Sequence, residues 1–494
     1  MNKVKVDKLV RKYLQQKGLP LSPALTFEDV TIVDQFSDIP TRSELEHATG
    51  TTRMLVVKNI FLNIPVVSAN MDTITESRMA IAMARAGGMG FIHQFLSVAD
   101  RAKEIELVKR AHSGVIEKPL VATPDTTLAA AKSLMAEYKI SSLLVVDHSG
   151  KLLGILARRD YMFEDNNAKT VGELMKRNSL ITASPHTTVA RAQKILAEHK
   201  IEKLPLVDRK GIVKGLITAQ DIAKTQRFPL AARDEKGRLL VGGTVGVSGK
   251  VLYDVEALLK AEADIILIDT ARGNSRRLID TVLSIRKNFG SKIPLIAGNI
   301  DTPDACLRLI NAGVDAVKVG IGGGSACKTR MGPGVGIPQL SAIAECTAIA
   351  REYRVPVIAD GGIKNSSDFA KALAAGAYAV MLGGLLAGTE ETPGKPFYED
   401  GEKWKIFRGS ASIEFQMSRI DREDRMDFIR TPEGVPKRVK YRGEVTPVLG
   451  ELMGHLYSSM SYVGAWTLSE FWERAFFRMQ TRSGYEEGRP HDVY

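Results

Sequence analysis

The stretch "DAVKVGIGGGSACKTR", residues 315–330, is an apolar β-rich segment that runs directly into a glycine-rich loop. Seven other segments have the same design, a short apolar run that ends in small or polar residues. They are "IPVVSANMD" (64–72), "GMGFIH" (88–93), "LLVGGTVG" (239–246), "ADIILIDTA" (263–271), "IPLIAGN" (293–299), "VPVIADGG" (355–362) and "AYAVMLGG" (377–384). Amphipathic helical stretches, such as "DTPDACLRLINAG", separate most of the later segments. This alternation is typical of a parallel sheet that is covered on both faces.

Eight such units predict an α/β fold of the (β/α)8 TIM-barrel type. In that fold the active site lies at the carboxyl ends of the strands, which here read "SANMD", "DTARGN", "AGN", "GIGGGSAC", "ADGG" and "LGG". A doubly wound sheet is the alternative. It is disfavoured because no early strand leads into a fingerprint helix start followed by a ribose-binding acid.

The spacing of the strands is interrupted once, because two strands precede residue 95 and six follow residue 238. The interval contains an internal repeat, in which "PLVATPDTTLAAAKSLMAEYKISSLLVVDHSGKLLGILARRD" resembles "SLITASPHTTVARAQKILAEHKIEKLPLVDRKGIVKGLITAQD". Three pairs of identical residues lie 61 positions apart: Pro124 and Pro185, Gly154 and Gly215, Asp160 and Asp221. We therefore predict three regions: a first barrel part (1–112), an inserted domain (113–228) and a second barrel part with a C-terminal tail (229–494).

The composition, 44% hydrophobic, 25% charged and 6% aromatic, is ordinary for a soluble globular protein. No apolar run approaches the roughly 18 residues that span a bilayer, and the charged amino terminus lacks the apolar core of a signal peptide. Three cysteines form an odd and sparse set, which argues against a disulfide framework and for a reducing compartment. We expect a cytoplasmic protein with no membrane partner.

The net charge of +11 raises the possibility of nucleic-acid binding. The basic residues, however, are scattered among acids, as in "ARRDYMFEDNNAK" and "SRIDREDRMDFIR", and no basic block alternates with aromatic residues. A solvated surface explains the charge better, followed by binding of small anions such as nucleotides. We expect no nucleic-acid partner.

Glycines gather at three consecutive strand ends, where successive backbone N–H groups can turn toward one anion. We call this set the glycine cluster: Gly320, Gly322, Gly323 and Gly324 with the following Ser325, then Gly361 and Gly362, then Gly383 and Gly384. Phosphate binding by the loops after strands 7 and 8 is a recurrent barrel arrangement. Each group alone is weak evidence because barrel loops are rich in glycine, but together they predict a phosphorylated substrate.

Cys327 follows the glycine cluster, whereas Cys306 and Cys346 fall on predicted helix faces. A loop thiol near Lys328, Arg330 and the positive ends of backbone amides is expected to have a lowered pKa and to act as a nucleophile. The alternative is an incidental loop residue. Metal binding by Cys327 is disfavoured, since no other Cys or His lies at ligand spacing.

Several motifs together resemble the IMP dehydrogenase / GMP reductase family: "SANMDTITE", "IDTARGNS", "AGNI", "VGIGGGSACKTR", "GVGIPQ", "ADGGI", "VMLGGLLAGTEE", "RGSAS", "PEGV" and "YVGA". The resemblance covers nearly the whole chain in the right order. The repeat resembles a tandem pair of cystathionine-β-synthase-type (CBS) modules, placed where this family usually has its insertion. The alternative for the repeat is an insertion that has lost its ligand.

The resemblance implies that Cys327 attacks C2 of the purine and forms a covalent thioimidate, E-XMP*, with Thr329 and Glu433 also catalytic. It implies substrate contacts by Ser68, Ser325, Asp360, Gly362, Gly383, Gly384, Gly409 and Arg430. It places the nicotinamide cofactor at Asp269, Thr270, Asn299 and Gly320. It implies a monovalent cation such as K⁺ on the backbone carbonyls of Gly322, Gly324 and Cys327. In the CBS pair it implies adenine or guanine nucleotides bound at Asp160 and Asp221.

The two activities of the family differ in the fate of the adduct at C2. By resemblance, the dehydrogenase hydrolyses it with an Arg-Tyr pair on a flap, and the reductase uses the Thr and the Glu to handle ammonia. Between Gly409 and Glu433 no Arg-Tyr dipeptide occurs, and "FIRTPEG" resembles the reductase pattern. We therefore predict an NADPH-dependent GMP reductase.

IMP dehydrogenase, which oxidises IMP to XMP with NAD⁺, is the alternative. The CBS pair and the tail "EEGRPHDVY" favour it, and "RGSAS" departs from both patterns. A catalytically idle nucleotide sensor is a third hypothesis, which the intact Cys327 and Thr329 disfavour. The family further implies a homotetramer or octamer.

Overall fold

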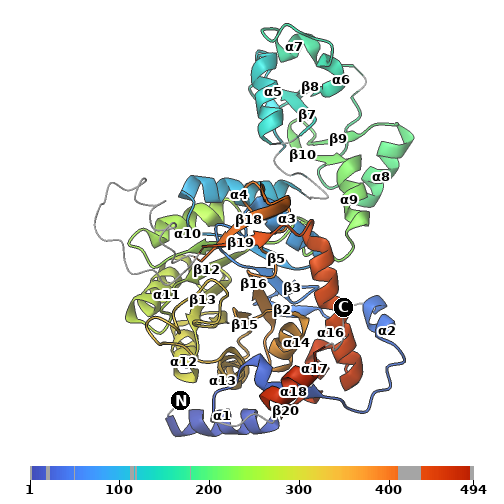
Figure 1. Cartoon of the computed structure of the whole chain (residues 1–494). Coiled ribbons are helices and arrows are strands. Elements are labelled where there is room, and N and C mark those ends of the chain that lie inside the picture. Colours follow the sequence, from blue (N-terminus) through green and yellow to red (C-terminus); the bar gives the residue numbers. More distant parts are fainter. Residues whose placement is uncertain are drawn as a thin grey trace. The chain divides into compact units, whose positions relative to one another are not determined.

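A computed structural model describes residues 3–489 of the chain apart from 18–22, 49, 112–115, 117–118, 139, 179 and 410–435. The chain divides into two compact units (Figure 1). The first unit comprises residues 1–108, 230–232 and 240–494, and the second comprises 109–229 and 233–239. The limits 113–228 of the predicted inserted domain stay a prediction.

In the first unit, eight parallel strands of the described chain close into a barrel in the order β11-β12-β13-β14-β15-β16-β4-β5. Their bounds are β4 (Val66–Ser68), β5 (Met89–Ile92), β11 (Val241–Val245), β12 (Ile265–Asp269), β13 (Leu295–Ile300), β14 (Ala316–Val319), β15 (Val357–Asp360) and β16 (Ala379–Leu382). The predicted (β/α)8 fold is confirmed, and the doubly wound alternative is wrong. Nearly every strand residue is buried, as expected for strands packed on both faces.

Helices follow the strands and form the outer layer of the barrel (Figure 1). They are α3 (Ser77–Ala86), α4 (Val98–Ala111), α10 (Val251–Lys260), α11 (Arg276–Phe289), α12 (Pro303–Ala312), α13 (Gln339–Ala350), α14 (Ser366–Ala374) and α16 (Val445–Val463). The sequence sets their ends. Before α12, the Thr302 hydroxyl accepts the Ala305 N–H and Pro303 occupies the first turn, where no N–H is needed. After it, Gly313 adopts the left-handed conformation and donates to Leu309 and Ile310.

The other elements of the first unit lie outside the barrel layers. They are α1 (Lys3–Gln16), a 3-10 turn (Phe27–Asp29), β1 (Val30–Val33), α2 (Arg42–His47), β2 (Met54–Val57), β3 (Ile60–Leu62), a 3-10 turn (Arg351–Tyr353), β17 (Phe397–Glu399), β18 (Glu402–Arg408), β19 (Pro436–Lys440), α17 (Leu468–Arg474), β20 (Phe476–Met479) and α18 (Arg482–Glu487). Strand β1 pairs with β20, so the two ends of the unit are joined. Strands β17, β18 and β19 form an antiparallel sheet in which β18 and β19 flank segment 410–435.

The second unit consists of two similar halves. Its elements are β6 (Val121–Ala122), α5 (Leu128–Glu137), β7 (Ser142–Val146), β8 (Leu152–Ala157), α6 (Arg158–Tyr161), α7 (Val171–Leu174), α8 (Val189–Glu198), β9 (Lys203–Val207), β10 (Val213–Thr218) and α9 (Ala219–Arg227). Each half has its own apolar core. Core residues of the halves lie 61 positions apart: Ala131 and Ala192, Met135 and Leu196, Leu143 and Leu204, Val145 and Leu206, Leu156 and Ile217. The sequence repeat therefore reflects one packing scheme used twice.

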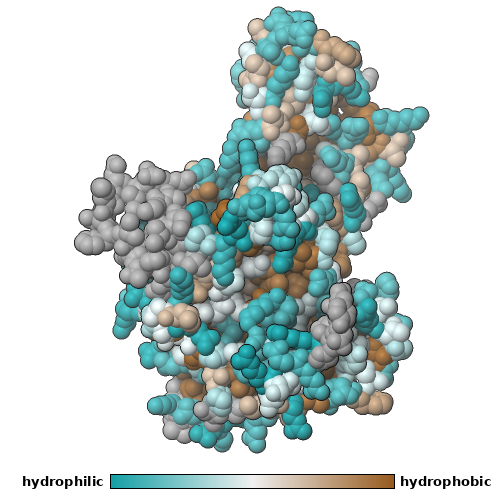
Figure 2. Space-filling view, in the orientation of Figure 1, coloured by the Kyte–Doolittle hydropathy of each residue, from teal (hydrophilic) through white to brown (hydrophobic). Residues whose placement is uncertain are grey.

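Hydrophilic residues cover most of the face shown in Figure 2, and hydrophobic residues form smaller patches between them. Among the described residues, every helix is too short or too polar to cross a bilayer.

The barrel interior requires a glycine at one strand position. A Cβ added to Gly242 on β11 would lie 2.2 Å from a ring carbon of the buried Phe91 on β5. We expect Gly242→Ala to lower the free energy of unfolding by about 1–3 kcal/mol through overpacking. Urea denaturation checks this, and adding Phe91→Leu should restore part of the loss. Gly450→Ala, on the exposed side of α16 with open space around it, serves as the control and should not destabilise.

Candidate active site

A buried lysine joins the carboxyl ends of four barrel strands. Lys318 on β14 is 2% exposed. Its Nζ lies 2.8 Å from Asp269 Oδ1, at the end of β12, and 2.6 Å from Asp360 Oδ2, at the end of β15. The same Nζ donates to Asn299 Oδ1 on β13. One ammonium group therefore binds two carboxylates and an amide at the mouth of the barrel.

The charge on Lys318 is stabilised by these contacts. Burial alone would lower the pKa of Lys318, but the charges of Asp269 and Asp360 and their hydrogen bonds more than offset it, so the pKa lies above its ordinary value. Asn299 Nδ2 donates to Asp360 Oδ2 and to the Gly320 carbonyl, each at 2.8 Å. Three of the predicted cofactor residues (Asp269, Asn299 and Gly320) and the predicted substrate contact Asp360 thus belong to one hydrogen-bonded group.

Gln339, at the start of α13, connects the next pair of strand ends. It is 5% exposed, and its Nε2 donates to the carbonyls of Val319 at 2.9 Å and Asp360 at 3.2 Å. Its side chain lies directly under Gly320 and Gly362, whose added Cβ atoms would lie 2.8 Å and 3.1 Å from it. Gln339 therefore fixes the spacing between two parts of the glycine cluster.

The structure brings the three parts of the glycine cluster together. An ideal Cβ on Gly361 would lie 3.1 Å from the Gly324 nitrogen, and one on Gly384 would lie 2.8 Å from Ser325 Oγ. Gly361 has a φ of +93°, a conformation that other residues rarely adopt. The loops therefore approach so closely that side chains at Gly361 and Gly384 would fill the space between them, and such close glycine-rich loops suit a phosphate group.

Cys327 lies in the turn that follows, and its N–H donates to the Gly324 carbonyl at 3.0 Å. Its side chain is half-buried. Its Sγ lies 3.1 Å from Thr329 Oγ1 and accepts the Thr329 N–H at 3.5 Å. The thiol is thus accessible and has a hydroxyl group within reach for proton transfer.

The other two cysteines have a different environment. Cys306 on α12 and Cys346 on α13 are fully buried, and the Cys306 thiol donates to the Cys346 carbonyl at 3.6 Å. Burial raises the pKa of the Cys346 thiol, which keeps it protonated. Both act as small apolar side chains of the helical layer.

The described residues on both sides of segment 410–435 are held at the barrel mouth. Arg408, at the end of β18, forms a two-point ion pair with Asp72, which follows β4. Lys437 on β19 donates to the Ser325 carbonyl at 2.5 Å. Gly409 lies next to Arg408 and is buried. The chain thus enters and leaves the segment beside the Cys327 loop.

The remaining predicted site residues lie in several environments. The Ser68 hydroxyl, at the end of β4, is fully buried and accepts a hydrogen bond from Thr75 at 2.9 Å, which places it beneath the mouth. Thr270 follows Asp269 and is half-buried. The predicted cation ligands Gly322 and Gly324 lie in the Cys327 loop, and the cation itself stays a prediction. Two predicted residues, Arg430 and Glu433, lie outside the described residues.

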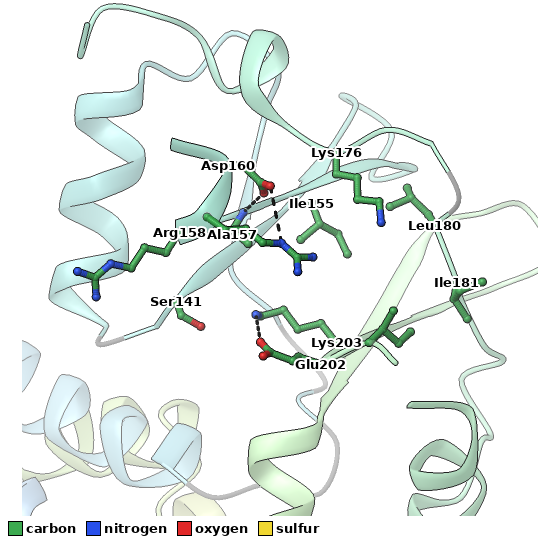
Figure 3. Close-up of a pocket in the computed structure, with 12 residues that line it drawn as sticks. Ser141, Ile155, Ala157, Arg158, Asp160, Lys176, Leu180, Ile181, Glu202 and Lys203 are labelled. Atoms are coloured by element: carbon green, nitrogen blue, oxygen red, sulfur yellow. Dashed lines mark hydrogen bonds and ion pairs between the residues drawn. The ribbon is translucent and has the colours of Figure 1, made fainter. Parts of the chain in front are cut away.

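The second unit contains a cavity of about 250 Å³ between its two halves (Figure 3). The basic side chains of Arg158, Arg159, Lys176 and Lys203 line it together with Asp160 and Glu202. Such a lining suits an anion. Asp160 Oδ2 accepts the Ala157 N–H at 2.7 Å, so one oxygen of this predicted nucleotide contact caps a helix. Asp221 lies on α9, and its side chain is outside the described part.

The sequence interpretation missed Lys318 and Gln339. A signal existed for Lys318, because it is the one charged residue within the apolar run "AVKV" that forms a fully buried strand. A charge at such a position needs a partner. Gln339 gave no such signal, because a glutamine at a helix start is ordinary.

Comparisons with known proteins found relatives of this chain in both sequence and structure. Residues 24–491 match the family profile described as "IMP dehydrogenase / GMP reductase domain". The chain is 47% identical to inosine-5′-monophosphate dehydrogenase of Aquifex aeolicus and 45% identical to that of Nitrosopumilus maritimus, over 96% and 95% of this chain and 96% and 98% of those proteins. A solved structure of GMP reductase from Trypanosoma brucei in complex with guanosine 5′-monophosphate superimposes with a TM-score of 0.89 at 37% identity, covering 96% of this chain and 99% of the other.

Removing the buried ammonium should destabilise the protein in a pH-dependent way. We expect Lys318→Met to lower the free energy of unfolding by about 3 kcal/mol at pH 8, because two carboxylates would remain close together without a counter-charge. Their folded-state pKa would then rise, and protonation at low pH would relieve the repulsion, so the loss should be smaller at pH 5. Urea denaturation at both pH values measures it.

The matched control for this substitution is Lys318→Arg, which keeps the positive charge. It should be less destabilising and show the pH dependence of the parent chain. An equal loss at pH 5 and pH 8 for Lys318→Met would show that the charge of Lys318 does not stabilise the two carboxylates.

Proposed function

This chain belongs to the IMP dehydrogenase / GMP reductase family, and from that premise we propose that it reduces GMP to IMP and ammonia with NADPH. We base the direction of the reaction on the sequence between Gly409 and Glu433, which has no Arg-Tyr pair to activate water. The nearby Cys327 and Thr329 supply what the reductive reaction needs, a nucleophile and a hydroxyl 3.1 Å from its sulfur.

In the first proposed step the Cys327 thiolate adds to C2 of the purine, and the 2-amino group takes up a proton and leaves as ammonia. This gives the thioimidate E-XMP* on Cys327. Thr329 and Glu433 are the groups we assign to moving that proton. Hydride addition at C2 then breaks the C–S bond, which releases IMP and the thiolate. NADPH, when bound, supplies the hydride and becomes NADP⁺.

The described residues fit both ligands. The glycine cluster and Ser325 suit the 5′-phosphate, and Asp360 suits the ribose hydroxyls, since a carboxylate accepts two hydrogen bonds. Asp269, Thr270 and Asn299 would hold the nicotinamide end beside Gly320. Lys318 holds Asp269 and Asp360 in place, because its Nζ lies 2.8 Å and 2.6 Å from their carboxylate oxygens.

IMP dehydrogenation is the second candidate, and a specific observation favours it. The two relatives with 47% and 45% identity are both named inosine-5′-monophosphate dehydrogenase. In that reaction hydride leaves C2 for NAD⁺ and water hydrolyses the adduct to XMP. Cys327 would have the same role in both directions, so the thiol itself does not distinguish them.

Two assays that follow the reduced cofactor by its absorbance at 340 nm test the direction of the reaction. The reductase proposal predicts that GMP causes oxidation of NADPH with release of ammonia. Formation of NADH from IMP and NAD⁺, without oxidation of NADPH by GMP, would contradict it. Cys327→Ser should abolish either activity, since a hydroxyl is a far weaker nucleophile at neutral pH. Cys306→Ala, at a buried helical cysteine, is the control and should stay active.

We also propose that the second unit is a CBS pair that binds an adenine or guanine nucleotide in its basic cavity. A GMP reductase of Trypanosoma brucei has been solved in complex with guanosine 5′-triphosphate, at 34% identity and a TM-score of 0.78. The proposal places the phosphates among the basic side chains of the cavity, where charge-assisted hydrogen bonds are strongest.

Nucleotide binding to the full chain should therefore raise its melting temperature. We expect Arg158→Ala with Lys176→Ala to weaken binding of ATP or GTP at least tenfold in isothermal titration calorimetry. Lys210→Ala removes a charge from an exposed turn of the same unit and should leave binding unchanged. Unchanged affinity in the double variant would refute the assignment.

A further inference from the structure

A second buried lysine lies in the antiparallel sheet formed by β17, β18 and β19. Lys405 on β18 is 2% exposed. Its Nζ donates to the carbonyls of Thr389 at 3.0 Å and Thr392 at 2.7 Å, and to the Thr392 hydroxyl at 3.0 Å. The Glu390 carbonyl lies slightly further away, at 3.4 Å. We call these four oxygen atoms the oxygen cage.

The oxygen cage holds the ammonium group without a carboxylate. Within the described residues Lys405 forms no ion pair, and its contacts are those of the cage. Burial lowers the pKa of Lys405, and the negative charges of Glu390 and Glu391 only partly oppose this. A lysine ammonium has three N–H donors, which matches the three oxygens at 3.0 Å or less. Backbone carbonyls also surround bare monovalent cations in proteins, so Lys405 acts here as a cation attached to β18.

The Thr389 carbonyl shows why a cation is needed in the cage. Besides the Lys405 ammonium it accepts the Thr392 hydroxyl at 2.7 Å and the Thr392 N–H at 3.3 Å. Thr389 and Thr392 are both buried. Buried carbonyl oxygens that lose a donor are left unpaired at a considerable cost in free energy. The ammonium group therefore holds the backbone of residues 389–392 in this conformation.

The residues of the cage end a turn that begins in the glycine cluster. The Gly383 carbonyl accepts the N–H groups of Leu386 at 3.1 Å and Ala387 at 3.0 Å. The Leu386 carbonyl accepts the Thr389 N–H at 3.2 Å and the Thr389 hydroxyl at 2.8 Å. Leu386, Ala387 and Thr389 are all buried. A continuous series of hydrogen bonds thus joins Gly383 to the carbonyl that binds Lys405.

Strand β18 is itself fixed at the barrel mouth. Arg408, three residues beyond Lys405 on this strand, binds Asp72 through its side chain. Its backbone N–H donates to the Thr73 hydroxyl at 3.3 Å. Both partners follow β4, which is the neighbour of β16 in the barrel. Lys405 therefore connects a strand anchored after β4 with the turn that follows β16.

We propose that Lys405 is a positioning residue, whose ammonium group fixes the turn 383–392 so that Gly383 and Gly384 can contact the 5′-phosphate of the substrate. The inference rests on the proposed function, which places that phosphate in the glycine cluster. Gly384 is exposed, and a Cβ added to it would lie 2.8 Å from Ser325 Oγ. Contacts that orient a substrate are sensitive to displacements of about 1 Å, so a turn released from Lys405 would bind the phosphate poorly.

General destabilisation is the competing explanation for any loss in a Lys405 variant. It would weaken binding of the nucleotide and of the cofactor, and it would slow the chemical step as well. A positioning role predicts a loss confined to the nucleotide. The reason is that the proposed cofactor contacts Asp269 and Asn299 lie on other strands, and Cys327 lies in another loop.

The test measures the affinity of the full chain for GMP and for IMP by isothermal titration calorimetry, and steady-state kinetics in the direction in which the parent chain is active. We expect Lys405→Met to weaken both nucleotides about tenfold or more and to raise the nucleotide KM by a similar factor. The cofactor KM and kcat should change by less than about twofold, because binding that is equal in the ground state and the transition state affects KM alone.

Lys440→Met is the matched control. It removes an exposed lysine from β19 of the same sheet, where Lys440 forms a surface ion pair with Glu402 at 2.7 Å. Such a pair contributes little to stability, so all of these constants should stay unchanged.

Lys405→Ala allows a chemical rescue that tests the ammonium group itself. The substitution removes three carbons and the ammonium group, which are the atoms of n-propylammonium. Added n-propylammonium chloride should restore GMP affinity to this variant, whereas n-propanol with the same concentration of sodium chloride should not. Equal rescue by n-propanol would show that the bulk of the side chain matters and its charge does not, which would overturn the proposal.

Thr392→Val keeps the proposal testable if Lys405→Met does not fold. It preserves the shape of the side chain and removes one oxygen of the cage, so nucleotide affinity should fall while the cofactor KM stays unchanged. Unchanged nucleotide affinity in the variants, or equal losses for nucleotide and cofactor, would overturn the proposal.

These outcomes are independent of the reaction direction. Nucleotide-selective losses in a chain that oxidises IMP and does not reduce GMP would refute the proposed reaction and leave the assignment of Lys405 standing. GMP reduction by a chain whose Lys405 variants bind GMP as tightly as the parent would do the reverse.

Discussion

The ammonium group of Lys318 is the interaction on which the barrel mouth depends. Asp269 and Asp360 end strands on either side of β14, and two carboxylates so close would repel each other without a cation between them. Lys318 supplies that cation from inside the barrel wall, and Asn299 completes the contacts. Because one ammonium group binds both carboxylates, the proposed ribose and nicotinamide subsites share a single cation.

The glycine cluster has a different role. Because glycines have no side chains, three loops can approach closely enough to contact one anion. Side chains at Gly361 or Gly384 would occupy the space where the loops meet. Gln339 then sets the distance between two of these loops by binding the carbonyls of Val319 and Asp360. The Cys327 turn follows the cluster directly, so the position of the thiol relative to a bound phosphate depends on these packed backbone contacts.

The barrel could be predicted because eight continuous apolar runs each end in small or polar residues. This pattern is local, since each run can be recognised from its own residues. The repeat in the second unit could be predicted for the same reason, since equivalent core positions recur at a fixed interval. The contacts of Lys318 and Gln339 could not, because each joins residues from separate strands that meet only after the barrel closes.

The direction of the reaction depends on few residues, and overall similarity weighs little in deciding it. Both proposed activities would use the same barrel, glycine cluster and thiol, and the chain resembles dehydrogenases and reductases alike over nearly its whole length. The residues that decide the fate of a C2 adduct are those that either activate water or move a proton to ammonia. This chain is 47% identical to a named dehydrogenase and has no Arg-Tyr dipeptide between Gly409 and Glu433. The proposed direction therefore rests on the sequence of segment 410–435.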